Sequence, residues 1–221
     1  MRVFSGLSAP EATLARAVSP KRLTALIMRP EQKTYQRVVR PSGTGMRSGR
    51  GDRGRLYQGR ANTDNPKQVL FVCTANVCRS PIAQAIFNAL AGERGLPWRA
   101  ESAGVAALVD EDITPNARAA LDEVGIYAGE HRARQVSEEM LEEADLVLGM
   151  GPRHVATLRR RFGGFSERVY TLPQYALGAP PEEGIPDPYG QTMTAFRASV
   201  RQLLEYTEAL VGRLEREGAL R

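Results

Sequence analysis

One stretch of the chain limits its fold more than any other, residues 69–81, with the sequence VLFVCTANVCRSP. Four apolar residues, Val69 to Val72, lead into Cys73 without a polar break, and Arg79-Ser80-Pro81 then opens a helical pattern. This order predicts a buried strand, a tight loop and a helix. Such a loop aims backbone N–H groups and the positive end of the helix dipole at the end of the strand. We therefore expect an anion to bind there.

Cys73 and Arg79 place reactive groups at this site. A cysteine at a helix N-terminus beside an arginine is shifted toward the thiolate, the nucleophilic form. Arg79 carries a planar fork of donors that suits two oxygens of a phosphoryl group, and it stays charged at any working pH. The Ser80 hydroxyl can donate a hydrogen bond to the thiolate when it leaves. The motif predicts a nucleophile on the floor of an anion pocket.

The C-x5-R spacing has a second interpretation. A buried structural cysteine followed by a surface arginine gives the same pattern, so the spacing alone is weak evidence. In this chain the motif ends an apolar strand and opens a helix, as phosphoryl chemistry requires. This context favours the functional interpretation.

These residues resemble a known family. Residues 72–81 are similar to the phosphate loop of the low-molecular-weight protein-tyrosine-phosphatases, and residues 187–189 (Asp-Pro-Tyr) are similar to their general-acid motif. The resemblance runs from about residue 68 to about residue 214, with further matches at residues 102–104 and 131–135. It implies a phosphomonoesterase that works through a phosphocysteine intermediate without a cofactor. The implied catalytic residues are Cys73, Arg79 and Asp187, and the implied substrate and phosphate contacts are Thr74, Ala75, Asn76, Val77, Cys78, Ser80 and Tyr189.

Asp187 lies between two prolines, Pro186 and Pro188. Proline fixes its own φ and restricts its neighbour, so the carboxylate is held in an extended, exposed loop. Asp-Pro is by itself most often a turn. Cleavage of a phosphate ester leaves an oxyanion that needs a proton, and the same carboxylate can then take a proton from the attacking water. We expect Asp187 to be this acid and base, and Tyr189 to form a wall against which a flat substrate group stacks.

Four other residues are assigned outside the catalytic steps. Asn76 is expected to hold the turns of the loop through its side chain. His131 resembles a family histidine that supports the loop from behind, although a lone histidine is also often a satisfied core residue. His154 is expected on the surface. Cys78 is either a small apolar residue packed under the loop or, as the resemblance suggests, a resolving thiol that pairs with oxidised Cys73.

The remaining sequence predicts alternating helices and strands. Strands are expected at 98–102, 145–150 and 168–172, and helices at 80–95, 114–124, 137–143, 152–161 and 192–217. This alternation is typical of a parallel sheet covered on both faces. The fold class is therefore a single three-layer α/β domain with a central four-stranded parallel sheet flanked by helices and the phosphate loop after the first strand.

Charge divides the chain in two. Residues 1–66 carry a net charge of +9, and residues 67–221 carry −4. The basic segment is rich in Gly and Arg and poor in apolar residues between positions 41 and 65, which predicts disorder. Three interpretations stay open: a targeting peptide, an arm that contacts nucleic acid or an anionic membrane, or an extension without function from a misplaced start codon, which we favour. We expect the phosphatase domain to occupy residues 67–221.

Several classes of protein do not fit the sequence. No apolar run approaches the roughly 20 residues that a membrane span needs, and no secretory apolar region is present, so no membrane association of the domain is expected. Two cysteines in one loop make no disulfide framework, and a reactive thiol suits the reducing cytoplasm. His131 and His154 are far apart and no Cys/His cluster has ligand spacing, so no metal is expected.

The function favoured by the sequence is a protein-tyrosine-phosphatase that acts on phosphorylated protein substrates. The nearest alternative is a protein phosphoarginine phosphatase, because residues 161–164 and 169–172 resemble bacterial members of that subgroup. The resemblance suggests that tyrosine-directed members of the family have an aliphatic residue at the position of Val77, whereas phosphoarginine-directed members have a Thr there. Arsenate reduction usually passes electrons along three cysteines, and this chain has two. A phosphate-binding module without catalysis is disfavoured by the intact Cys73, Arg79 and Asp187.

Overall fold

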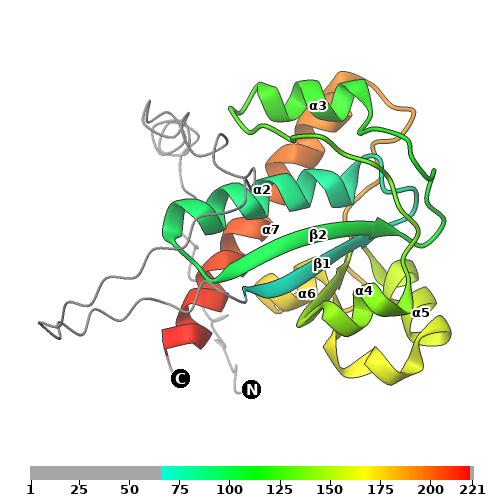
Figure 1. Cartoon of the computed structure of the whole chain (residues 1–221). Coiled ribbons are helices and arrows are strands. Elements are labelled where there is room, and N and C mark those ends of the chain that lie inside the picture. Colours follow the sequence, from blue (N-terminus) through cyan, green and yellow to red (C-terminus); the bar gives the residue numbers. More distant parts are fainter. Residues whose placement is uncertain (1–65, 220–221) are drawn as a thin grey trace, which may run out of the picture. The chain divides into compact units, whose positions relative to one another are not determined.

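The computed structural model describes residues 66–219. The predictions for the basic segment therefore lie almost wholly outside the described residues. Helices and strands alternate along the described chain (Figure 1). Their bounds are β1 Lys67–Cys73, α2 Arg79–Arg94, β2 Trp98–Gly104, α3 Pro115–Asp122, α4 Glu138–Glu143, β3 Leu146–Gly149, α5 Pro152–Arg161, the 3-10 helix η2 Gly163–Arg168, β4 Val169–Thr171, α6 Leu172–Leu177 and α7 Met193–Ala219.

The strands form one four-stranded sheet in the order β2-β1-β3-β4, and every pairing is parallel. From β1 the chain crosses to β2 on one side and later returns to β3 on the other side. The strand order therefore reverses at β1, and in such sheets the ligand crevice opens beyond the carboxyl end of the strand at the reversal. Cys73 is the last residue of β1. The predicted four-stranded parallel sheet is confirmed.

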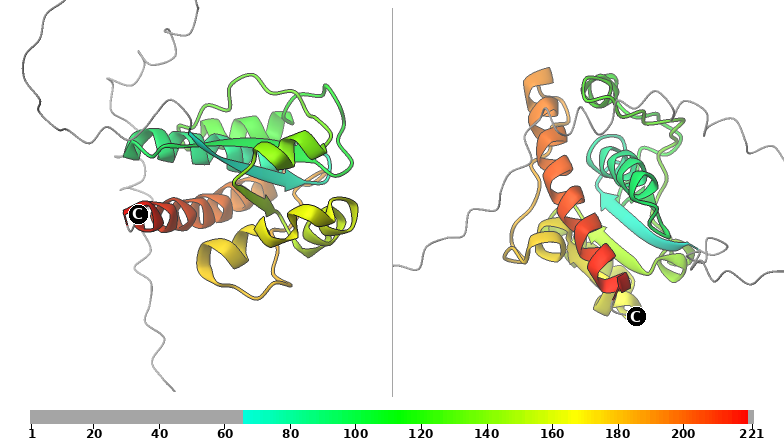
Figure 2. Two further views of the ribbon diagram at one scale, coloured as in Figure 1. Left: turned by 60° about the horizontal axis from the view of Figure 1, so that its bottom comes forward. Right: turned by 90° about the vertical axis from the view of Figure 1, so that its left-hand side faces the viewer.

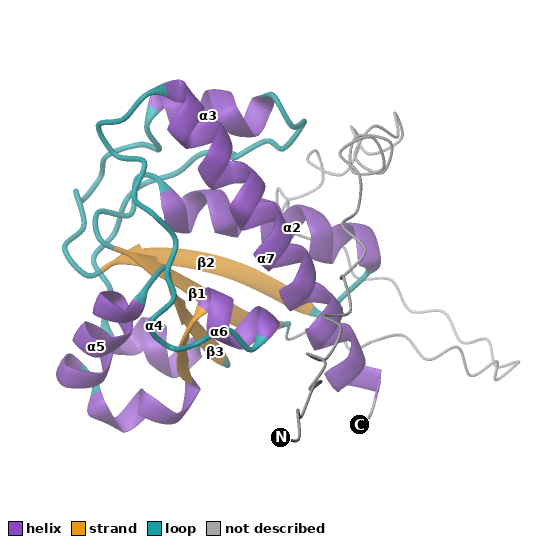
Figure 3. Cartoon of the chain, turned by 180° about the vertical axis from the view of Figure 1, so that it is seen from behind, coloured by secondary structure: helices purple, strands orange, loops and turns teal. Residues whose placement is uncertain are grey.

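Helices cover both faces of the sheet (Figures 1 and 3). On one face Phe71 of β1 packs edge to face against Phe87 of α2, with 5.9 Å between the ring centroids. Helix α7 runs alongside α2 (Figure 2), and its buried residues recur at helical spacing from Phe196 to Leu214. On the other face Leu70 and Val72 belong to a buried cluster that includes residues of α4 and α5, among them Leu141. The apolar run of β1 is therefore buried from both sides, as the sequence predicts.

Two short helices were not predicted. The sequence predicts a strand that includes residue 172, but β4 ends at Thr171, whose Oγ1 accepts a hydrogen bond from the N–H of Gln174 at 3.2 Å and caps α6. Pro173 lies in the first turn, where its missing N–H costs nothing. Helix α6 ends at Gly178, whose φ of 70° suits a residue without a side chain. The second unpredicted element is η2, which connects α5 to β4.

Candidate active site

The loop between β1 and α2 has its carbonyl groups tied to the segment that follows β2. The carbonyls of Cys73, Thr74 and Ala75 accept hydrogen bonds from backbone N–H groups of Val105, Ala106 and Leu108, each at 3.0 Å. In the same loop, the carbonyls of Asn76 and Val77 accept from the His131 imidazole and from the N–H of Thr114, respectively.

This arrangement of the carbonyls orients the N–H groups of the loop. In a planar trans peptide the C=O and the N–H point in opposite directions. Five successive carbonyls that face the surrounding chain therefore turn the five following N–H groups, those of residues 74–78, toward the centre of the loop. The N–H of Asn76 donates to Cys73 Sγ at 3.3 Å, as this geometry requires. The loop is a cradle of donors for an anion.

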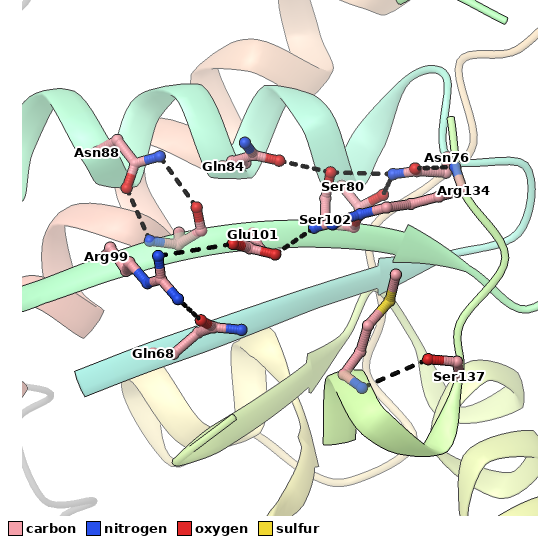
Figure 4. Close-up of polar contacts among 12 residues, drawn as sticks. Gln68, Asn76, Ser80, Gln84, Asn88, Arg99, Glu101, Ser102, Arg134 and Ser137 are labelled. Carbon is pink, nitrogen blue, oxygen red and sulfur yellow. Dashed lines mark hydrogen bonds and ion pairs between the residues drawn. The ribbon is translucent and has the colours of Figure 1, made fainter. Parts of the chain in front are cut away.

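Asn76 holds the cradle together. Its φ of 60° lies in the left-handed region, which asparagine tolerates better than most residues. Its side-chain Nδ2 donates to the hydroxyls of Ser80 and Ser102, both at 3.0 Å, and its Oδ1 accepts from the N–H of Arg134 at 2.9 Å. Figure 4 shows this row of polar side chains, which continues from Ser102 to Gln84. Asn76 is fully buried, so the structural role expected of it agrees with its contacts.

Ser80 lies beside the sulfur of Cys73. The two side-chain atoms are 3.0 Å apart, and the Ser80 oxygen accepts a hydrogen bond from Asn76. The single hydroxyl hydrogen can then go to Cys73 Sγ or to the carbonyl of Ala103, which is 3.3 Å away. When the sulfur is a thiolate it can therefore accept two hydrogen bonds, one from Ser80 and one from the N–H of Asn76.

Arg79 connects the loop to the segment of Asp187. Its Nη1 donates to the carbonyl of Ile185 at 3.1 Å, and its Nη2 forms an ion pair with Asp187 Oδ2. The Arg79 side chain is 7% exposed, and its Nε is buried without a hydrogen-bond partner among the described residues. The Ile185 N–H donates to the carbonyl of Met150 at 2.8 Å, which ties the segment to the end of β3. These contacts hold Asp187 beside Arg79 at the loop.

A pocket of about 280 Å³ lies at this place. The structure brings most of the predicted site residues to it, and adds Leu108, which the sequence did not single out. Its lining comprises Cys73, Thr74, Ala75, Val77, Cys78, Arg79, Leu108, Asp187 and Tyr189. Leu108 is 44% exposed and Tyr189 is 55% exposed, so both are free to contact a substrate group at the pocket mouth. No periodic pattern marks Leu108 in the sequence, since it lies in a loop.

His131 and Cys78 flank the loop. His131 Nε2 donates to the Asn76 carbonyl at 2.7 Å, and burial lowers the pKa of this imidazole. Cys78 is buried, and its Sγ lies 3.4 Å from Thr114 Oγ1. Burial raises the pKa of the Cys78 thiol to about 11, so the thiol is protonated at neutral pH.

His154 is not on the surface, and that prediction is wrong. The residue is 6% exposed, and its Nε2 lies 3.0 Å from Thr74 Oγ1. It is on the inner face of α5, together with Val155 and Leu158. The spacing of these three residues is a helical signal that could have placed His154 inside.

Among residues 66–219, no group of three or more His, Cys, Asp or Glu side chains is arranged to hold a metal ion, and no helix has the length and hydropathy of a membrane span.

Comparisons with known proteins agree with this geometry. The family described as low molecular weight phosphotyrosine protein phosphatase matches residues 68–220. A protein-arginine-phosphatase of Bacillus subtilis is 36% identical over 67% of this chain and 97% of its own length. A probable low molecular weight protein-tyrosine-phosphatase, EpsP of Ralstonia solanacearum, is 33% identical over 69% of this chain and 99% of its own. The structure of the YwlE arginine phosphatase from Geobacillus stearothermophilus is 32% identical, covers 71% of this chain and 97% of its own, and superimposes with a TM-score of 0.65. The chain therefore belongs to the low-molecular-weight phosphotyrosine protein phosphatase family of cysteine-dependent protein phosphatases.

Proposed function

We propose that this protein removes phosphoryl groups from phosphorylated proteins by way of a phosphocysteine at Cys73. The observation that carries this proposal is the position of Cys73 Sγ, which has two hydrogen-bond donors beside it and lines the same pocket as the Arg79–Asp187 pair. The Cys73 thiolate attacks phosphorus while the loop N–H groups and Arg79 stabilise the phosphoryl oxygens.

Asp187 serves both halves of the reaction. In the first half its carboxylic acid gives a proton to the leaving group as the bond between phosphorus and the substrate breaks. In the second half its carboxylate takes a proton from water, which attacks the phosphocysteine and releases inorganic phosphate and the Cys73 thiolate. Ser80 donates to that thiolate as it leaves.

Phosphoarginine is the substrate that the relatives support better. The B. subtilis and G. stearothermophilus relatives are both described as arginine phosphatases, and both are matched over nearly their whole length. A guanidine leaving group also fits beside Asp187, because a carboxyl group that gives its proton to the departing nitrogen has a second oxygen that can accept from a neighbouring N–H.

Phosphotyrosine is the second candidate, and Val77 favours it. This side chain lines the pocket together with Leu108 and Tyr189, so three apolar or aromatic groups face the substrate. A phenol ring gains from such contacts, whereas a guanidinium leaves its donors unpaired beside them. EpsP, a probable tyrosine phosphatase, supports the same alternative.

One assay distinguishes the two candidates. Purified protein is offered a phosphoarginine protein and a phosphotyrosine peptide, and kcat/KM is measured for each with p-nitrophenyl phosphate as a common reference. A higher value on phosphoarginine supports the first candidate, and the reverse order supports the second. Absence of turnover on all three substrates would contradict the proposed activity.

A further inference from the structure

A hydroxyl in the pocket is held from behind by a buried imidazole. Thr74 follows Cys73 in the chain and lines the pocket. His154 lies in α5, the helix that follows β3. Thr74 Oγ1 and His154 Nε2 are 3.0 Å apart. Gly149 allows this approach, because a Cβ at that position would lie 3.1 Å from His154 Cβ and 3.2 Å from Val155 Cγ2. The end of β3 therefore leaves room for the imidazole to reach the loop.

The contacts of the imidazole favour one tautomer. Burial, followed by the positive charge of Arg79, lowers the pKa of His154 to about 4, so the ring is neutral at pH 7 and carries a single N–H. Within residues 66–219, its Nδ1 is buried without a hydrogen-bond partner. The Gly151 carbonyl lies near the ring but already accepts the N–H groups of His154 and Val155, at 3.0 and 3.4 Å. A hydrogen on Nδ1 would thus face only this shared carbonyl, outside hydrogen-bond geometry, which is costly in a buried site, whereas a hydrogen on Nε2 is paired with Thr74.

This tautomer determines what Thr74 can do. If Nε2–H donates to Thr74 Oγ1, the hydroxyl cannot use its own hydrogen on the imidazole. That hydrogen can then be donated to an anion in the pocket, together with the backbone N–H groups of residues 74–78. We propose that His154 is a positioning residue that holds the Thr74 hydroxyl as an additional donor to a phosphoryl oxygen of the substrate. The proposal rests on the proposed phosphatase function and adds a side-chain donor to its backbone cradle.

The first test measures phosphate binding in a double-mutant cycle. The variants are Thr74→Val, His154→Leu and the two combined, and calorimetry gives the dissociation constant of inorganic phosphate without any need for turnover. Thr74→Val removes the donor with little change of shape, and we expect about a tenfold weaker binding, the usual worth of a hydrogen bond to a charged group. His154→Leu should weaken binding nearly as much, and the combined variant should be no worse than Thr74→Val alone.

Two further variants separate positioning from general packing. His154→Gln keeps a side-chain N–H and should recover much of the phosphate affinity lost in His154→Leu. Thr207→Val is the matched control, because Thr207 is fully buried in α7 and its hydroxyl has no partner in the part of the chain that the structure describes. This control should leave phosphate binding and kcat unchanged. Losses that add in the combined variant, or parental binding in Thr74→Val, would overturn the proposal.

The second test observes the imidazole directly in the parent, and a variant is used only to assign the signals. The chain has two histidines, so ¹⁵N spectra of the parent contain two imidazole rings, and His154→Gln assigns them. We expect the hydrogen of His154 on Nε2 at pH 7, and a hydrogen on Nδ1 would refute the proposed geometry. Turnover of p-nitrophenyl phosphate is measured separately. A parent that binds phosphate through the coupled pair but hydrolyses nothing would contradict the phosphatase function and support the positioning role.

Discussion

Arg79 and Asp187, 108 positions apart in the sequence, form a direct ion pair across the pocket. The arginine side chain is almost wholly buried, whereas the aspartate side chain is 47% exposed. A phosphoryl group that enters the pocket competes with the aspartate for the same guanidinium. In the proposed mechanism, this pair holds Asp187 and Arg79 in place until substrate arrives, and the substrate then frees the carboxyl group to accept a proton.

This relationship predicts that Asp187→Ala has opposite effects on catalysis and on phosphate binding. Loss of the acid should slow substrates with poor leaving groups by about 10²–10⁴, and activated esters less. Loss of the competing carboxylate should increase the affinity for inorganic phosphate by about two- to fivefold, since a partly exposed ion pair contributes little free energy. Steady-state kinetics on a phenyl and a p-nitrophenyl ester, with calorimetry of phosphate, measure both effects.

Glu123→Ala is the control for this prediction. It also removes a carboxylate paired with an arginine, Arg197, but this pair lies on the exposed surface outside the pocket. The variant should match the parent in both measurements. Equal rate losses of Asp187→Ala on the two esters would remove Asp187 from proton transfer.

Replacement of the nucleophile tests the mechanism more simply. Cys73→Ser should lose essentially all turnover, because a serine hydroxyl at neutral pH is a far weaker nucleophile than a thiolate. The donors of the loop and Arg79 remain, so the variant should still bind phosphate or vanadate. Phosphate release from a phosphopeptide and calorimetry of vanadate are the two measurements, and appreciable turnover would refute the phosphocysteine step.

Local signals in the sequence were sufficient to predict the element that carries this chemistry. The apolar run up to Cys73, the following loop and the helix that begins at Arg79 lie within one short segment, so strand, loop and helix could be read directly. The position of Asp187 over the pocket was expected from the resemblance to the family. The backbone bonds from Val105 and Leu108 to the loop could not be predicted, because that segment is irregular and its hydrogen bonds depend on the tertiary fold.

His154 shows the same limit in part. Its spacing with Val155 and Leu158 places it on the inner face of α5, but its contact with the loop depends on Gly149 and on packing between distant segments. Helix α6 is a different case, since Thr171 and Pro173 form a local start signal that was present in the sequence. The prediction of a longer strand there was an error of interpretation.

The burial of His154 predicts a pH dependence of stability. Its pKa is about 4 in the folded protein against 6.5 as the ordinary value, so the unfolded chain binds the proton first as the pH falls. The free energy of unfolding should therefore decrease between about pH 6.5 and pH 4, by up to about 3 kcal/mol from this group. Urea titrations at several pH values in this range measure the slope. His131, whose pKa is also lowered, adds to it in the same direction.

His154→Gln isolates the contribution of His154. The variant keeps His131 and has no ring at position 154 to titrate, so its stability should fall less steeply across the same pH range. The pKa values of the Asp112 and Glu123 carboxyl groups are also lowered. These groups change the stability at the acid end of the range, and they do so in both proteins. Identical slopes in parent and variant would contradict the assignment.

Cys78 offers a test of redox protection. The family resemblance implies that oxidised Cys73 forms a disulfide with Cys78, whose thiol burial keeps protonated at neutral pH. We expect peroxide inactivation to be reversed by dithiothreitol in the parent and much less in Cys78→Ala, whose Cys73 can proceed to the sulfinic acid. Recovery of activity after timed peroxide exposure is the measurement. Equal recovery in both proteins would leave Cys78 with a packing role alone.

Substrate choice should depend on Val77. This side chain is 2% exposed and lines the pocket, so a change at this position acts on the substrate rather than on solvent. Valine and threonine have nearly the same shape, and Val77→Thr therefore adds a hydroxyl and little else. A hydroxyl can pair with an N–H of a guanidinium leaving group, whereas beside a phenol ring it is a buried polar group without a partner.

The cost of an unpaired polar group sets the size of the effect. It is about 1–3 kcal/mol, which corresponds to roughly 10–100-fold in selectivity. Val77→Thr should therefore shift the ratio of kcat/KM values toward phosphoarginine over phosphotyrosine, whichever substrate the parent prefers. Val77→Ala is the matched control, since it removes apolar contact without adding a hydroxyl and should weaken phosphotyrosine turnover without a gain on phosphoarginine. If Val77→Thr and Val77→Ala change the ratio equally, the hydroxyl is not the discriminating group, and the preference must come from Asp187, Leu108 and Tyr189 at the pocket mouth.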